Sequence, residues 1–446
     1  MLKTSVHDTE RLKGLVRPLD GSSTDLDEVV EKCRGARYAL LGEATHGTHE
    51  FYRIRAEITK RLLRDHGFTG VAIEGDWPDA YRVHRYVRGT CDDCEAADAL
   101  GGFKRFPTWM WRNADVLDFV GWLRSFNDCR PPKDRAGFYG LDLYSLYGSI
   151  YAVIEYLERT DPAAAARAKE RYGCFDRFGG DVETYAHTAG MGLSLSCERE
   201  VIEQLLELQR AAFEGVAGAG FTDDQHFFAE QNAYVVAGAE EYYRTMLRGD
   251  VSSWNLRDDF MYRTLERLSR HLERTHSAPT KLVVWAHNSH VGDARATSMG
   301  AGREFNIGQL VRQGNRSSCQ LIGFTTSSGT VTAASQWHGE AARKVVRAPV
   351  RGSWESFFHS TGIANFYLDL GSAVALYPEL RAPLLERAIG VLYLPQSELH
   401  SHYMYARLGE QFDAIFHYDR TRAVEPLERN VRWEAGEVPE TFPSGV

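Results

Sequence analysis

The residues best suited to chemistry form a short motif, Gly42-Glu-Ala-Thr-His-Gly47, directly after the apolar run Tyr38–Leu41. A histidine three residues from a glutamate is a pair suited to general-base catalysis. The carboxylate can hold one ring nitrogen while the other takes a proton from water. The apolar run is too short for a helix and is typical of a buried strand. From Thr45 onward the residues fit a helix, so we expect Glu43 and His46 close to the amides of its first turn.

The same design recurs along the chain, as a short apolar run that ends in ionisable side chains. One such motif is as consistent with capping and loop residues as with catalysis, so the recurrence carries the argument. The later runs end in Glu74 and Asp76, in Asp142, and in His287 and His290. In an open α/β sheet the carboxyl ends of the strands face the ligand crevice, so we expect these side chains to meet His46 there.

Imidazoles and carboxylates at one site support three chemistries. The first is activation of water by an imidazole as the water attacks a carbonyl. The second is a metal site, because His, Asp and Glu bind zinc and non-haem iron, and His46, His287, His290 and Glu43 could form such a set. The third is covalent catalysis, which is the weakest of the three. The chain has no G-x-S-x-G motif, and Ser289 lies on a loop between two histidines.

The elements that must position these residues follow from hydrophobic periodicity. Helices are predicted at 24–33, 51–66, 80–87 and 115–126, and strands at 38–41, 70–76, 136–142 and 281–286. From 145 to 276 helical periodicity takes over, with a glycine-rich connector at 215–220. Strand candidates resume at 320–325, 364–370, 391–394 and 414–417, and an extended tail is predicted from 424 onward. We therefore predict an α/β fold with a mostly parallel central sheet and flanking helices. Residues 1–144 and 277–446 form this core, and residues 145–276 form a large inserted helical subdomain.

Length and composition describe an ordinary globular protein of 446 residues, 43% hydrophobic and 25% charged. The net charge of -9, without a basic block, argues against a nucleic-acid partner. No apolar stretch approaches the ~20 residues of a membrane span, and the N-terminus has no apolar signal core. We therefore expect no membrane partner and a cytoplasmic location. The seven cysteines are scattered and odd in number, which does not indicate a disulfide framework.

Several motifs, in their order along the chain, resemble the erythromycin esterase family. They are Gly42-Glu-Ala-Thr-His-Gly47 with Glu50, Phe51 and Arg55; Ile73-Glu-Gly-Asp76; Phe106-Pro-Thr-Trp-Met-Trp-Arg112; Trp285-Ala-His-Asn-Ser-His290; and Gln411-Phe-Asp-Ala-Ile-Phe-His417. The resemblance implies hydrolysis of a macrolide lactone ester without a metal or other cofactor. It implies His46 as the base that activates water, and Glu43 as the group that orients it. Further catalytic residues are expected at Glu74, His287 and His290, and substrate-binding residues at Arg55, Asp76, Trp109, Trp111 and Arg257.

The substrate is left open by the sequence. Asp76-Trp77 and Trp109-Met-Trp111 resemble family members from polysaccharide or natural-product contexts more than the macrolide esterases. The leading hypothesis is a metal-independent hydrolase of a lactone or carboxylic ester. In it, His287 or His290, with Arg55, stabilises the oxyanion or donates to the leaving alcohol. The alternatives are a biosynthetic enzyme that forms or rearranges an ester, a metal-dependent hydrolase, and a binding protein whose tryptophans stack on a ligand.

Overall fold

The computed structural model describes residues 6–193, 196–213, 223–275, 279–315 and 318–435. The strands of its central sheet are β1 (Arg17–Pro18), β2 (Tyr38–Leu41), β3 (Gly70–Asp76), β4 (Gly137–Asp142), β5 (Leu282–Trp285), β6 (Cys319–Ala333), β7 (Ala342–Val346), β8 (Asn365–Asp369) and β11 (Ala414–Thr421). This nine-stranded sheet has the order β1-β8-β11-β6-β2-β5-β3-β4, with β7 paired to β6. The strands from β11 to β4 in this order are parallel, whereas β1, β7 and β8 run antiparallel to their partners. The predicted α/β fold with a mostly parallel central sheet is thus confirmed.

Burial explains why the central strands could be recognised in the sequence. Every residue of β2, β3, β4 and β5 is buried. Parallel strands covered on both faces read as continuous apolar runs. The strand predicted at 391–394 is wrong, because this segment forms only one isolated bridge, from Leu392 to Ala334. A small antiparallel pair, β9 (Leu384–Arg387) with β10 (Tyr403–Ala406), lies close to it in the sequence.

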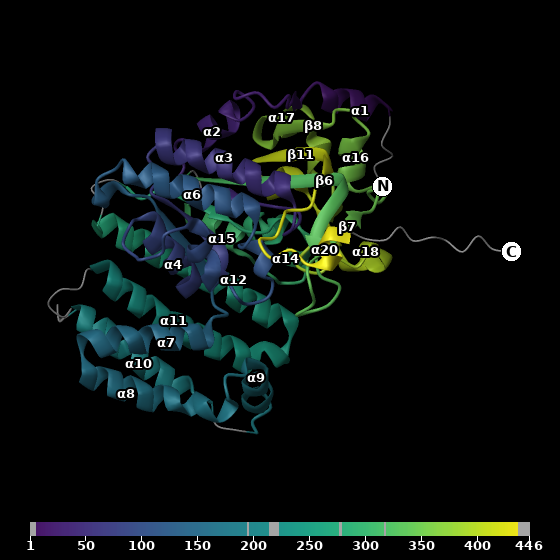
Figure 1. Cartoon of the computed structure of the whole chain (residues 1–446). Helices are drawn as coiled ribbons and strands as arrows, with labels where there is room; N and C mark the ends of the chain where they lie inside the picture. The colour runs from purple at the N-terminus through teal and green to yellow at the C-terminus, as the bar shows by residue number, and fades with distance from the viewer. Residues whose placement is uncertain (1–5, 194–195, 214–222, 276–278, 316–317, 436–446) are drawn as a thin grey trace.

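Helices cover both faces of the sheet (Figure 1). On one face lie α2 (Asp27–Cys33), α3 (His49–Asp65) and α6 (Ala114–Asp128), and on the other lie α12 (Asp250–Thr275), α15 (Ile307–Asn315), α16 (Trp354–His359) and α17 (Leu370–Leu376). Successive side chains of a strand point to opposite faces. Accordingly Leu41 packs in the core of the first face and Leu40 in that of the second. The tail predicted to be extended contains a short helix, α20 (Val431–Ala435).

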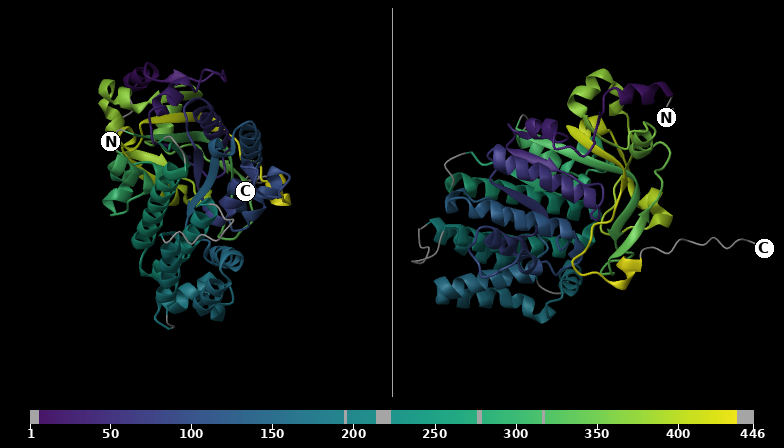
Figure 2. Two further views of the ribbon diagram at one scale, coloured as in Figure 1. Left: turned by 90° about the vertical axis from the view of Figure 1, so that its left-hand side faces the viewer. Right: turned by 45° about the horizontal axis from the view of Figure 1, so that its top comes forward.

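Between β4 and β5 the described residues form helices and the loops that connect them (Figures 1 and 2). The helices α7 (Leu146–Thr160), α8 (Pro162–Tyr172), α9 (Val182–Gly190), α10 (Glu198–Phe213) and α11 (Asp223–Thr245) share a core of their own. In contrast, α12 packs on the sheet through Met261, Leu265 and Leu268. The domain limits at 145 and 276 stay a prediction, and the connector predicted at 215–220 lies outside the described residues. No helix in the described ranges is long and apolar enough to cross a membrane.

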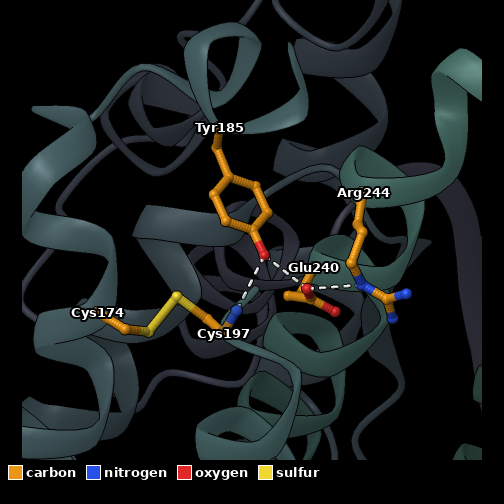
Figure 3. Close-up of a disulfide and its surroundings, with 5 residues drawn as sticks. All are labelled: Cys174, Tyr185, Cys197, Glu240 and Arg244. Carbon is orange, nitrogen blue, oxygen red and sulfur yellow. Dashed lines mark hydrogen bonds and ion pairs between the residues drawn. A yellow bond between two sulfur atoms is a disulfide. The ribbon is translucent and has the colours of Figure 1, made fainter. Parts of the chain in front are cut away.

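One disulfide joins Cys174 and Cys197 in this helical segment, although the scattered cysteines did not indicate it. The bond connects the 3-10 helix η4 (Gly173–Phe178) to the residue before α10. Figure 3 shows Tyr185 of α9 beside it. The hydroxyl of Tyr185 accepts from the Cys197 backbone N–H at 3.2 Å and donates to Glu240 at 2.5 Å. Glu240 also accepts from Arg244 at 2.9 Å. The disulfide and the hydrogen bonds of Tyr185 and Glu240 together connect α9, α10 and α11.

Candidate active site

The acids and histidines selected from the sequence meet at the carboxyl ends of four neighbouring strands, in the order β2-β5-β3-β4. In the register of these strands Leu41, Trp285, Ile73 and Gly140 lie side by side. β5 belongs to the second half of the chain but is inserted between β2 and β3. Its carboxyl end therefore delivers His287 and His290 beside the acids that follow the first strands.

The loop after β2 differs from its prediction. Helix α3 begins at His49, so the predicted helix start at Thr45 is wrong and residues 42–48 form a loop. Close packing dictates this path. A Cβ atom at Gly42 would collide with Asn288 Oδ1, and one at Gly47 would collide with the backbone of Thr332. The two glycines of the motif thus let the loop press against α13 (Asn288–Val291) and β6.

His46 is held by Glu43, which is in turn held by Arg55. Nδ1 of His46 lies 2.9 Å from Glu43 Oε1, and Arg55 Nη2 donates to Glu43 Oε2 at 2.5 Å. The guanidinium is fully buried over the rings of Tyr52 and Trp285. Because the carboxylate accepts the Nδ1 proton, Nε2 of a neutral His46 is the free proton acceptor. Arg55 lies behind Glu43 and has no exposed surface that a substrate could contact.

His287 lies beside His46, with the two ring centroids 4.8 Å apart. The backbone N–H of Ser289 donates to His287 Nδ1 at 3.2 Å, and Ser289 Oγ lies 2.8 Å from the same nitrogen. Burial, reinforced by His46, lowers the pKa of His287 to about 3, so the ring is neutral at neutral pH. With Nδ1 as an acceptor, the ring proton is on Nε2. This nitrogen is buried and lacks a well-aligned hydrogen-bond partner among the described residues, although the backbone of Ala44 also acts on the ring and raises its pKa. His287 thus offers an unpaired N–H donor next to His46.

His290 is enclosed by two carboxylates and a tryptophan. Its Nδ1 lies 2.9 and 3.0 Å from the two oxygens of Asp258, and its Nε2 lies 3.4 Å from Glu74 Oε1. The ring stacks on Trp254 of α12 at 4.5 Å. Burial disfavours the imidazolium, but Asp258 and Glu74 outweigh burial and raise the pKa of His290. The pKa of His290 therefore lies above that of an ordinary histidine, whereas His287 is neutral at neutral pH.

Glu74 is the central acceptor of the site. One oxygen accepts from the His287 backbone N–H at 2.9 Å and the other from Arg257 at 2.8 Å. Arg257 also donates to both oxygens of Asp142, at 3.0 and 2.6 Å. Burial would raise the pKa of Glu74, but His290 and Arg257 overcome it and hold this pKa well below its usual range. Arg257 thus bridges β3 and β4. Helical spacing alone did not distinguish it from a solvated surface residue.

The carboxylate of Asp76 forms an ion pair with Arg105. Sequence reasoning had not selected Arg105. Nε and Nη2 of Arg105 donate to the Asp76 carboxylate at 2.7 and 3.2 Å. The Asp76 side chain is 5% exposed and that of Arg105 is 44% exposed. Burial and the charge of Asp76 raise the pKa of neighbouring Asp79 to about 7. Arg105, rather than Asp76, therefore presents the accessible polar surface at this strand end.

Trp109 and Trp111 lie in the core rather than on an open surface, with 2% and 5% of their area exposed. The Trp111 indole N–H donates to the Glu74 backbone carbonyl at 3.2 Å, and its ring meets Tyr52 edge-on. Trp109 packs edge-on against Phe106. Trp111 thus supports β3, and neither tryptophan is exposed beside the catalytic side chains as a stacking surface.

Asp258 and Trp254 are further site residues that sequence reasoning did not select. Both lie on α12, on the helix face that carries Met261 and Leu265 toward the sheet. The available sequence signal was that Asp258 lies at helical spacing from the apolar residues Met261 and Leu265. Across the described ranges, the structure contains no group of three or more His, Cys, Asp or Glu side chains arranged to hold a metal ion.

Comparisons with known proteins agree with this architecture. The model of a family described as erythromycin esterase matches residues 63–421. An erythromycin esterase type II of Escherichia coli is 20% identical over 410 residues, which cover 87% of this chain and 90% of that protein. Among solved structures, a succinoglycan biosynthesis protein aligns with a TM-score of 0.72 and 21% identity, over 94% of this chain and 98% of its own. A mutant of the erythromycin esterase EreC in its open conformation aligns with a TM-score of 0.65 and 17% identity, over 91% and 96% of the two chains. Because the family match spans most of its length, this chain belongs to the erythromycin esterase family.

Proposed function

We propose that this protein is a metal-independent hydrolase that cleaves a lactone or carboxylic ester by general-base activation of water. One observation carries the proposal. Glu43 holds Nδ1 of His46 at 2.9 Å, and the ring beside His46 is a neutral His287 with an unpaired N–H. Such a site contains a proton acceptor and an oxyanion donor next to each other. Family membership supports a small-molecule ester as the substrate.

In the proposed mechanism His46 Nε2 takes a proton from water as the water oxygen bonds to the carbonyl carbon. The electron pair of the C=O bond moves to the carbonyl oxygen, and His287 Nε2–H donates to the oxyanion that forms, which requires this buried nitrogen to open to the bound substrate. A neutral imidazole serves this role because it polarises the carbonyl without requiring protonation. When the tetrahedral intermediate collapses, the bond to the alcohol oxygen breaks. The His46 imidazolium returns its proton to that oxygen, so His46 is regenerated.

The remaining residues of the site position these two histidines and the substrate. Arg55 supports His46 through Glu43, and Glu74 supports His287 through its backbone N–H. The side chains of Arg257 and Arg105 are 15% and 44% exposed. We assign to these two arginines the contacts with the polar groups of a bound substrate. This assignment keeps Arg257 as a substrate-binding residue and replaces Asp76 by its partner Arg105.

Charge pairing supports the metal-independent form of the mechanism. Glu43 is paired with Arg55, Glu74 and Asp142 with Arg257, Asp76 with Arg105, and Asp258 with His290. A divalent cation would have to compete with these resident cations for the same carboxylates. The arrangement favours instead the stabilisation of a developing negative charge on the substrate.

The test is His46→Asn, assayed on a panel of lactones and carboxylic esters that includes macrolides. We expect a loss of ~10²–10⁴ in kcat/KM, the range for removal of a general base. His49→Asn is the matched control. His49 also pairs with a carboxylate, Asp115 at 2.8 Å, but its ring nitrogens contact Asp115 and Arg422 rather than the site residues. A His46→Asn variant as fast as the wild type overturns the proposal. Activity lost to a chelator and restored by zinc selects the metal-dependent alternative, and ester products formed from activated acyl donors select the biosynthetic one.

A further inference from the structure

We propose that Asp258 of α12 is a positioning residue for this reaction. It holds His290 so that His290 anchors Glu74, and Glu74 in turn fixes His287. The inference rests on the proposed function, because it assigns a purpose to a carboxylate that touches neither water nor the reacting carbonyl. It also makes α12, the last helix between β4 and β5, part of the catalytic apparatus.

The contacts form a continuous chain from α12 to the donor histidine. Both Asp258 oxygens face His290 Nδ1, at 2.9 and 3.0 Å. The opposite ring nitrogen of His290 lies 3.4 Å from Glu74 Oε1. The other oxygen of Glu74 accepts from the backbone N–H of His287 at 2.9 Å. Each link is nearly or fully buried, so no contact in the chain is weakened by solvent screening.

Asp258 also fixes the backbone around His290. Its Oδ1 accepts from the N–H of Ile307 at 2.9 Å, the first residue of α15. The preceding residue, Asn306, donates to the carbonyls of Ser289 and Gly292 at 2.7 and 2.6 Å. These bonds clamp α13 between α12 and α15. The ring and the backbone of His290 are therefore oriented from the same two helices.

The charges that face His290 come from two elements besides its own helix, α13. Asp258 and Arg257 approach from α12 and Glu74 approaches from β3, while the neighbouring imidazole is that of His287, the N-cap residue of α13. Arg257 Nη1 lies 3.2 Å from His290 Nε2, a contact that is a hydrogen bond only when the ring is neutral. With Asp258 ionised, two carboxylates outweigh one guanidinium, which favours the protonated ring and its ion pair with Glu74. Without that carboxylate one carboxylate faces one guanidinium, and burial then favours the neutral ring.

The experiment is Asp258→Asn, compared with Asp259→Asn as the matched control. Asp259 is the adjacent residue on the same helix, but it is 37% exposed and pairs with Arg263 at 2.6 Å. We expect Asp258→Asn to lower kcat about 10–100-fold, the range for loss of a group that orients a metal-bound histidine, with little change in KM. We expect the control to leave both unchanged. In NMR titrations of the imidazole, His290 should keep its proton above pH 6.5 in the wild type and in Asp259→Asn. It should lose that proton at a lower pH in Asp258→Asn.

The proposal is overturned if His290 of the wild-type enzyme titrates at or below pH 6.5, a result that does not depend on how the variant folds. It is also overturned if Asp258→Asn and His290→Gln have additive effects on kcat, since residues that act as one chain are not additive. These readouts are separate from the test of the base. If His46→Asn retains activity, the proposed function fails even where the titration of His290 behaves as described.

Discussion

His46 and His287 lie with their ring centroids 4.8 Å apart and carry their protons on different nitrogens. Glu43 accepts the proton of His46 Nδ1, which frees Nε2 as an acceptor. The Ser289 backbone N–H donates to His287 Nδ1, which places the proton of that ring on Nε2. Opposite tautomers are thus fixed by a carboxylate on one side and by a backbone amide on the other. In the proposed reaction Nε2 of His46 takes a proton, and the neutral His287 donates a hydrogen bond from its own Nε2.

The buried pair of Arg55 and Glu43 gives a prediction about stability. Removing one partner of a buried ion pair leaves an uncompensated charge and costs about 3–5 kcal/mol. Arg55→Met should therefore lower the free energy of unfolding in urea by about that amount. The double variant with Glu43→Gln should recover part of the loss, because it removes the unpaired charge. Arg53→Met, on the exposed side of the same helix, is the control and should change little. Equal stability of Arg55→Met and the wild type would contradict the pairing.

Replacement of Ser289 tests whether the reaction passes through a covalent acyl-serine intermediate. The hydroxyl of Ser289 lies 2.8 Å from His287 Nδ1, the distance expected of a nucleophile and its base. An imidazole with its pKa lowered to about 3 is nevertheless too weak a base to activate a serine at neutral pH. Ser289→Ala should keep kcat within about tenfold of the wild type, because it removes one hydrogen bond to the ring. Rapid-quench kinetics should show no burst of alcohol release. A burst in the wild type that disappears in Ser289→Ala would establish the serine as the nucleophile.

The strands that carry the site were predictable from the sequence because they are buried on both faces. β2, β3, β4 and β5 read as apolar runs, and their polar ends mark the edge of the sheet where ligands bind. The partners of these ends were not predictable. Arg105 reaches Asp76, and Asp258 reaches His290, from segments whose place depends on how helices pack in space. Helical spacing says which residues share a face but not what that face meets.

The neutral state of His287 predicts how stability depends on pH. Its pKa is about 3 in the folded protein and 6.5 in the unfolded chain, so the folded form binds fewer protons between these values. Its contribution to stability is complete above pH 6.5 and is lost as the pH falls from 6.5 toward 3. His287→Gln has no such proton to bind. Its urea midpoint should therefore fall less than that of the wild type between pH 7 and pH 4.

A histidine outside the core provides the control for this pH dependence. The side chain of His338 is 70% exposed, and His338→Gln should retain the wild-type loss of stability on acidification. The dependence of kcat/KM on pH gives a second measurement. Because His287 has a pKa of about 3, its titration cannot cause a change in rate near neutral pH. The proposed origin of the effect fails if His287→Gln loses as much stability as the wild type between pH 7 and pH 4.

The disulfide between Cys174 and Cys197 gives the last prediction. The two cysteines are 23 residues apart in sequence, and closing a loop of this size stabilises a fold by about 3 kcal/mol in the chain-entropy model. Changing both cysteines to alanine should therefore lower the stability of the oxidised protein in urea by about this amount. Dithiothreitol should have a similar effect on the wild type and none on the double variant. Cys129→Ala, at an exposed free cysteine, is the control and should leave the response to dithiothreitol intact. If the oxidised wild type already exposes all seven thiols to a thiol reagent after unfolding, the bond is not formed.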